Sequence, residues 1–183
     1  MRWAAVATLV LLVACSGGGG SPQARSTRTP PAPTTTDALA GPGTVKSPPP
    51  GSEILGGGCG ANEVYKRGVL PDWANVNAPK FLPYVVAAPG LAVGYLFSFP
   101  LTATPDGNKI LWYVGTPRDG FALDATGNPL GATEPIATFS KVADSGPGEI
   151  YPSGVTVPVS GCWHFTLTWH GGDQRAAVDL LFK

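Results

Sequence analysis

Cysteine and histidine are the residue types in this 183-residue sequence with the clearest capacity for chemistry, and they number three and two. Cys162 and His164 lie two apart in VSGCWHFTLTWHGG, a spacing that places both side chains on one face of a β-strand. A nucleophilic cysteine needs a base within hydrogen-bonding distance. Same-face neighbours on a strand are about 7 Å apart, too far for that contact unless the strand bends. We therefore predict no catalytic residue from this pair.

Two histidines and an Asp-containing turn are the candidates for a metal site. His164 and His170 share the outward face, but their six-residue spacing corresponds to about 20 Å along a strand. The DATGN stretch that begins at Asp124 has oxygen ligands at alternate positions, yet it lacks the glycine and the distal glutamate of an EF-hand loop. We predict no metal and no cofactor. A hydrolase or metal-dependent enzyme that uses Asp124, Asp173 and His170 is the alternative hypothesis.

The N-terminal 15 residues have the features of an export signal. Arg2 supplies a positive charge, and Trp3 to Val13 is uncharged and mostly apolar, but shorter than the roughly 20 residues of a membrane-spanning helix. The LVAC sequence that ends at Cys15 is similar to the lipobox of bacterial lipoproteins, in which cleavage precedes a cysteine that carries lipid. The resemblance implies a signal peptide at 1–14 and a lipid such as palmitate on Cys15. The protein would then be anchored to the extracytoplasmic face of the cell membrane. An ordinary secretory signal is the other possibility.

Composition divides the remaining chain into a tether and one domain. Residues 15–52 are mostly Gly, Ser, Thr and Pro, which bury too little apolar surface to fold, so we predict a disordered linker. Residues 53–183 are enough for a single domain with its own core. The formal net charge is zero and there is no basic stripe, which argues against a nucleic-acid partner.

The cysteine count fits this organisation. With Cys15 assigned to lipid, Cys59 and Cys162 remain in the domain. An exported domain meets an oxidising environment, in which an even pair of cysteines usually forms a disulfide. We therefore predict a Cys59–Cys162 bridge, which would also prevent Cys162 from acting with His164.

Alternation of apolar and polar residues predicts an all-β domain. Odd positions are large and apolar in Trp163–Trp169, in 91–101 and at Val155, Val157 and Val159, whereas Lys109–Gly115 is apolar on both faces and is typical of a central strand. Gly-, Pro-, Asn- and Asp-rich turns separate these runs, including HGGDQ between the last two. No long stretch has a helical apolar period. The pattern predicts an antiparallel β-sandwich of about seven or eight strands.

The C-terminal sequence adds a resemblance to a known fold. PSGVTVPVSGCWHFTLTWHGGDQRAAVDLLFK, which spans Pro152–Lys183, resembles the last two strands of bacterial extracellular immunoglobulin-like domains and is similar to uncharacterised envelope lipoproteins with such domains. The resemblance implies an immunoglobulin-like sandwich with Trp112 as the core tryptophan of its third strand. One departure is that Cys59 precedes the first clear strand, so its bridge would join the N-terminal segment to the penultimate strand.

Trp73 marks the segment that we consider most open to a ligand. It lies in Leu70–Pro83, which is rich in Pro and Asn. An aromatic residue on irregular backbone either packs over an open end of the sandwich or is presented to a partner. We expect a monomeric, non-catalytic envelope module that binds an envelope protein or a cell-wall component. A purely structural subunit of a membrane complex is a third hypothesis.

Overall fold

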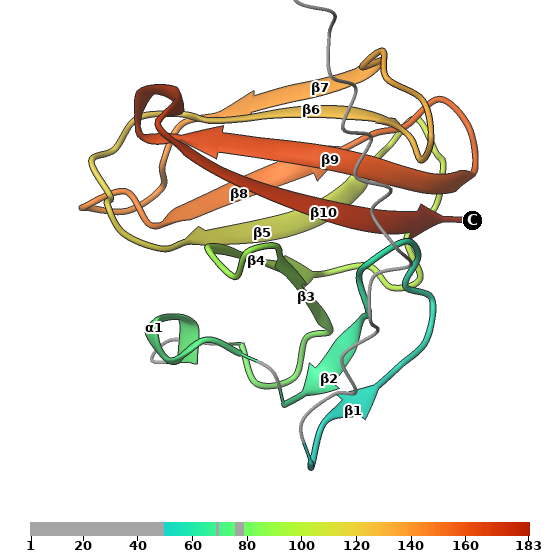
Figure 1. Ribbon diagram of the computed structural model, residues 1–183, viewed down its shortest axis with the longest axis horizontal. Helices are drawn as coiled ribbons and strands as arrows, with labels where there is room; N and C mark the ends of the chain where they lie inside the picture. Colours follow the sequence, from blue (N-terminus) through green and yellow to red (C-terminus); the bar gives the residue numbers. More distant parts are fainter. Residues whose placement is uncertain (1–49, 69, 76–78) are drawn as a thin grey trace, which may run out of the picture. The chain divides into compact units, whose positions relative to one another are not determined.

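A computed structural model describes residues 50–68, 70–75 and 79–183; the predicted signal peptide, Cys15 and the tether up to residue 49 lie outside these ranges. The described residues contain ten strands, one short helix and one 3₁₀ turn (Figure 1). Their bounds are β1 Glu53–Ile54, β2 Tyr65–Arg67, α1 Asp72–Asn75, β3 Tyr84–Ala87, β4 Ala92–Leu96, β5 Asn108–Val114, β6 Leu123–Pro129, β7 Ala137–Lys141, β8 Ile150–Val155, β9 Gly161–Trp169, η1 His170–Gly172 and β10 Gln174–Phe182. No helix in these ranges is long and apolar enough to cross a membrane.

The strands form two antiparallel sheets that enclose one core. One sheet has the order β1-β2-β3-β4-β5-β8, and the other has the order β10-β9-β6-β7 (Figure 1). Buried side chains from both sheets, among them Trp112 of β5 and Phe165 of β9, belong to a single apolar cluster. The β-sandwich predicted from the alternating pattern is therefore confirmed.

The strand order follows the immunoglobulin pattern. β4, β5 and β8 occupy the positions of strands A, B and E, whereas β10, β9, β6 and β7 occupy those of G, F, C and C′. β3 extends the first sheet beyond β4, and the very short β2 and β1 continue it. These added strands raise the number above the seven or eight expected, because runs of two to four residues carry no readable alternation.

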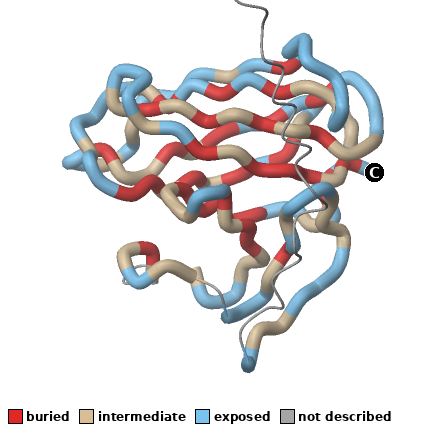
Figure 2. The backbone as a smooth tube through the Cα atoms, in the orientation of Figure 1, coloured by how far each residue is buried: buried red, intermediate tan, exposed pale blue. Residues whose placement is uncertain are grey.

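Alternation correctly predicted β9 and β10, which form the longest paired ladder. Trp163, Phe165, Leu167 and Trp169 are each at most 1% exposed, while the residues between them lie on the outer face. β10 pairs with β9 along its full length, and the turn η1 joins the two as the HGGDQ stretch predicted. Figure 2 shows the same alternation of buried and less buried positions along these strands.

The strand that the sequence predicted at Val155–Val159 is not formed, and this prediction was wrong. β8 ends at Val155, and the residues that follow form a loop in which Val157 is buried and Val159 is 55% exposed. Pro158 has no N–H to donate to a neighbouring strand, which favours the end of the ladder here. Two of the three valines, Val157 and Val159, thus lie beyond the end of the strand.

Trp112 is buried in the core but does not occupy the position that the immunoglobulin resemblance implied. It lies on β5, which pairs with β4 and β8, so it comes from the sheet opposite β9. The antibody-type core tryptophan is on strand C, which corresponds here to β6. The ring packs over Gly94 on β4, where an added Cβ would lie 2.6 Å from the indole.

A second apolar cluster covers the outer face of the six-stranded sheet. Its buried strand residues are Tyr84, Val93 and Tyr95. Ala74 of α1 packs against them and is 1% exposed. Leu70 and Trp73 are partly buried at its border. Leu70, Trp73 and Ala74 are therefore held on this face of the sheet by apolar contacts.

The predicted disulfide is present and fixes the N-terminal part of the domain. Cys59 is bonded to Cys162 on β9, the penultimate strand. Asp179 on β10 is 5% exposed and accepts the backbone N–H of Ala61, while its own N–H donates to Asn62 Oδ1. The covalent bond and these hydrogen bonds position the chain that leads into β2.

Candidate ligand-binding site

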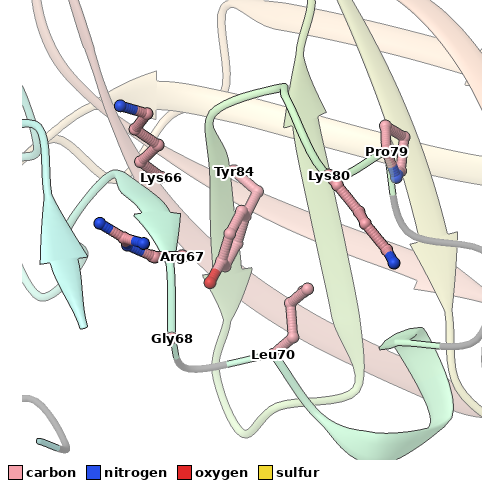
Figure 3. A pocket seen from close by; sticks show the side chains of 7 residues that line it. All are labelled: Lys66, Arg67, Gly68, Leu70, Pro79, Lys80 and Tyr84. Carbon is pink, nitrogen blue, oxygen red and sulfur yellow. The ribbon is translucent and has the colours of Figure 1, made fainter. Parts of the chain in front are cut away.

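A pocket of about 280 Å³ lies beside the second apolar cluster (Figure 3). Its lining comes from β2 and the turn after it, from the segment that precedes β3 and from β3 itself. The lining residues are Lys66, Arg67, Gly68, Leu70, Pro79, Lys80 and Tyr84. The pocket thus combines an aromatic and aliphatic surface with three cationic side chains.

Strand pairing brings the two sides of the pocket together. Tyr65 on β2 is the register partner of Tyr84 on β3, and Arg67 is the partner of Glu53 on β1. In Figure 3 Lys66 and Arg67 lie on one side of the Tyr84 ring and Lys80 lies on the other. The cations therefore come to the pocket from β2 and from the segment that precedes β3.

Tyr84, which lines the pocket, belongs to a row of four tyrosine rings. The Tyr65 and Tyr84 rings are stacked with centroids 5.8 Å apart, Tyr84 and Tyr95 are 6.0 Å apart, and Tyr95 meets Tyr113 edge-on at 5.4 Å. Burial raises the pKa of Tyr65, Tyr95 and Tyr113 above the ordinary value for tyrosine. The Tyr84 ring is therefore backed by a tightly packed aromatic row.

The electrostatic balance of the pocket is positive. Glu53 Oε1 accepts a hydrogen bond from Lys66 Nζ at 3.2 Å, and its Oε2 lies 2.9 Å from Arg67 Nη2. The Lys66 hydrogen bond is the main reason that the pKa of Glu53 is lowered. Lys80 forms no ion pair with any residue that the structure describes. The three lining cations and the one carboxylate paired with them leave an excess of two positive charges; Glu63, which acts on Tyr65, does not line the pocket.

The structure places the pocket partly in the segment expected from the sequence. Leu70, Pro79 and Lys80 belong to the Leu70–Pro83 segment, but Trp73, the residue singled out there, does not line the pocket. Trp73 is packed against the outer face of the sheet, and the Arg118 guanidinium lies 5.7 Å from its ring centroid. Arg118 is itself held by Glu149 at 2.7 Å.

Sequence reasoning missed Lys66, Arg67 and Tyr84. A signal was present, because Lys66 and Arg67 are the one pair of adjacent basic residues in a chain with 13% charged residues. Nothing in the sequence shows that Tyr84 lies beside them. That information appears only in the pairing of β2 with β3.

Cys162 and His164 have separate partners. The disulfide removes Cys162 as a thiolate, and His164 Nδ1 lies 2.7 Å from Asp179 Oδ1. Because Asp179 also binds the N–H of Ala61, this contact joins β9, β10 and the segment after Cys59. The Cys/His motif therefore belongs to the structural connection between the N-terminal segment and the sandwich.

The residues of the enzyme hypothesis come from β6 and from the turn after β9, and no side-chain hydrogen bond between Asp124, His170 and Asp173 is formed among the residues that the structure describes. His170 contacts Asp119, whose other carboxylate oxygen accepts the N–H of Phe121. Asp124 lies on β6, and Asp173 is an exposed residue of the turn before β10. Within the described ranges no group of three or more His, Cys, Asp or Glu side chains is arranged to hold a metal ion.

No family model, characterised protein or solved structure matches this chain. A fold alone does not define an activity, since sandwiches of this type carry many unrelated functions. Function is therefore inferred from the chain's own residues.

Proposed function

We propose that this protein is a membrane-anchored binding module of the cell envelope, with its ligand site in the basic pocket. The observation that carries the proposal is the arrangement of Lys66, Arg67 and Lys80 around the Tyr84 ring. Ligand sites typically combine an apolar surface with a few polar groups that fix orientation. The excess positive charge makes the ligand an anion.

The sequence before the domain supports a location outside the cytoplasm. The apolar N-terminus, the LVAC stretch ending at Cys15 and the Gly- and Pro-rich tether are together typical of a lipid-anchored protein. The Cys59–Cys162 bond supports the same location, since structural disulfides persist in oxidising compartments.

The residue types in the pocket favour binding over catalysis. Its described lining contains lysine, arginine, glycine, leucine, proline and tyrosine. Histidine, carboxylate, serine and cysteine, which most often act as general bases or nucleophiles, do not occur among these lining residues. The arrangement can attract, orient and hold an anion.

Retention on isolated cell envelopes tests this function. The Cys15→Ala variant of the full chain separates pocket binding from lipid anchoring. We expect its retention to fall about tenfold when Lys66, Arg67 and Lys80 are all replaced by alanine, and to weaken with added salt. A matched control replaces Lys109, Lys141 and Arg175, which removes the same charge from other surfaces.

Two results would contradict the proposal. Equal loss of retention in the pocket variant and in the matched control would mean that only net charge matters. Retention that is unchanged in both would show that the pocket does not bind envelope material. For the anchor, the intact chain should stay with membranes in high salt, whereas Cys15→Ala should be released.

A further inference from the structure

We propose that the basic pocket recognises a terminal phosphate monoester carried on a small organic group. The inference rests on the proposed function, namely that this pocket is the ligand site, and adds the chemical class of the ligand. It follows from the charge balance, from the free hydrogen-bond donors and from the size and apolar side of the cavity.

Charge balance selects a dianion. The pocket contains Lys66, Arg67 and Lys80, and Glu53 compensates one of these charges from the side of β1. A single carboxylate or a phosphate diester has one negative charge and would leave one cation unmatched. A phosphate monoester carries a charge of about −1.5 to −2 at neutral pH, which matches the excess of two.

The donors that remain free suit phosphate oxygens. Arg67 uses Nη2 toward Glu53, which leaves the other N–H groups of its planar fork for a second acceptor. Lys66 donates one of its three ammonium hydrogens to Glu53. Lys80 lies beyond Tyr84 with its ammonium turned away from the ring (Figure 3), and it is exposed on a flexible stem that can turn toward the pocket. A group with three acceptor oxygens can therefore be held by Arg67 and Lys66 and reached by Lys80.

The rest of the cavity limits the body of the ligand. Leu70, Pro79 and the Tyr84 ring give the pocket an apolar side. A volume of about 280 Å³ is at the lower end of the range for small-molecule sites. Tyr84 is 2% exposed and stacked on Tyr65, so its ring cannot move back to make room for a larger group. A short polyol or a single sugar ring fits these limits.

Isothermal titration of the full-length Cys15→Ala chain with three probes tests the ligand class. The probes are methyl phosphate, methyl sulfate and acetate. We expect methyl phosphate to bind at least about tenfold more tightly than the two monoanions at neutral pH. Its affinity should rise several-fold from pH 5 to pH 7.5, because the second phosphate ionisation has a pKa near 6. Methyl sulfate keeps one charge and should show no such rise.

Substitutions at Lys80 and at Glu53 should change the affinity for methyl phosphate in opposite directions. Lys80→Ala should weaken methyl phosphate binding about tenfold, and Lys80→Arg should restore most of it. Glu53→Gln should strengthen binding, because it releases Lys66 and Arg67 and leaves three charges unmatched. Lys141→Ala, an exposed change on β7, should have no effect. A residue that only supported the fold would not produce tighter binding when altered.

Vesicles separate a lipid headgroup from a free phosphorylated molecule. If the phosphate belongs to a lipid, Cys15→Ala should bind vesicles containing phosphatidic acid, a monoester, in preference to phosphatidylglycerol, a diester. If the ligand is a free molecule, soluble methyl phosphate should bind while neither vesicle does. Either result supports the monoester.

Three outcomes would overturn the inference. These are equal affinity for methyl phosphate and acetate, an identical pH response for methyl phosphate and methyl sulfate, or no gain in Glu53→Gln. If envelope retention still depends on the three cations while methyl phosphate shows no preference, only the ligand class fails. If retention is independent of the cations, the proposed function itself fails.

Discussion

Tyr65, Tyr95, Tyr113 and Tyr151 hold their phenolic protons more strongly than an exposed tyrosine does. Burial is the largest cause in each case, because a phenolate loses its hydration in the protein interior. Neighbouring groups add to the effect, including Glu63 for Tyr65 and Asp119 for Tyr151. The folded state therefore favours the neutral ring relative to the unfolded chain.

These shifts predict loss of stability in alkali. The folded pKa values lie above the unfolded value of about 10, so the stabilisation is complete below pH 10. As the pH rises further, the unfolded tyrosines release protons first and the free energy of unfolding falls. Phenolate absorbance should show fewer titrating tyrosines near pH 10 in the folded chain than in denaturant. Superimposed curves for the two states would contradict the prediction.

Single residues also show why the site was harder to predict than the fold. Lys66 and Arg67 lie 13 to 14 positions before Lys80, and the segment between them gives no regular pattern. Their proximity depends on the pairing of Tyr65 with Tyr84, a long-range contact between two short strands. Trp73 attracted attention by its residue type, but its apolar surface is used for packing.

At the level of elements, one contact between β6 and β9 places a glycine against an aromatic ring. Gly127 is the register partner of Phe165, and an added Cβ would lie 2.4 Å from the ring. The Phe165 ring also lies 6.4 Å from Phe139 and 6.2 Å from Phe182, measured between centroids. The ring therefore has little room to move aside.

Gly127→Ala should destabilise the sandwich by about 1–3 kcal/mol through overpacking. Gly154→Ala on β8 is the matched control, because no atom lies within 4 Å of the position of its Cβ. Urea unfolding of both variants measures the difference. The explanation is wrong if the two substitutions have the same effect on the denaturation midpoint.

The sequence predicted a strand correctly where one face of that strand is buried against the core and its opposite face is less buried. β9 and β10 have that character over nine residues each, so period-two alternation identified them. β4 is buried at all five positions because a second layer covers its outer face, and this layer left no clear sign in the sequence. β1, β2 and β3 are too short for any period to appear.

At the level of the whole molecule, the Cys59–Cys162 bond closes a loop with a sequence separation of 103. Restricting an unfolded loop of about 100 residues contributes on the order of 4.7 kcal/mol in the chain-entropy treatment. Replacing both cysteines by serine should lower the free energy of unfolding by about that amount. Denaturation with and without reductant measures it, and the double variant should not respond to reductant. An intact chain that is equally stable in reductant would refute the prediction.

The same bond determines how far the protein can be stretched. When the two ends of the chain are pulled apart, tension passes through the sulfur atoms and the residues between Cys59 and Cys162 carry none of it. At about 3.5 Å per extended residue, the bridge keeps on the order of 350 Å of chain from being drawn out. Lys66, Arg67 and Lys80 all lie inside that protected length. A domain held at its N-terminus and pulled at its C-terminus could thus gain length only from residues outside the bridge until the bridge is reduced.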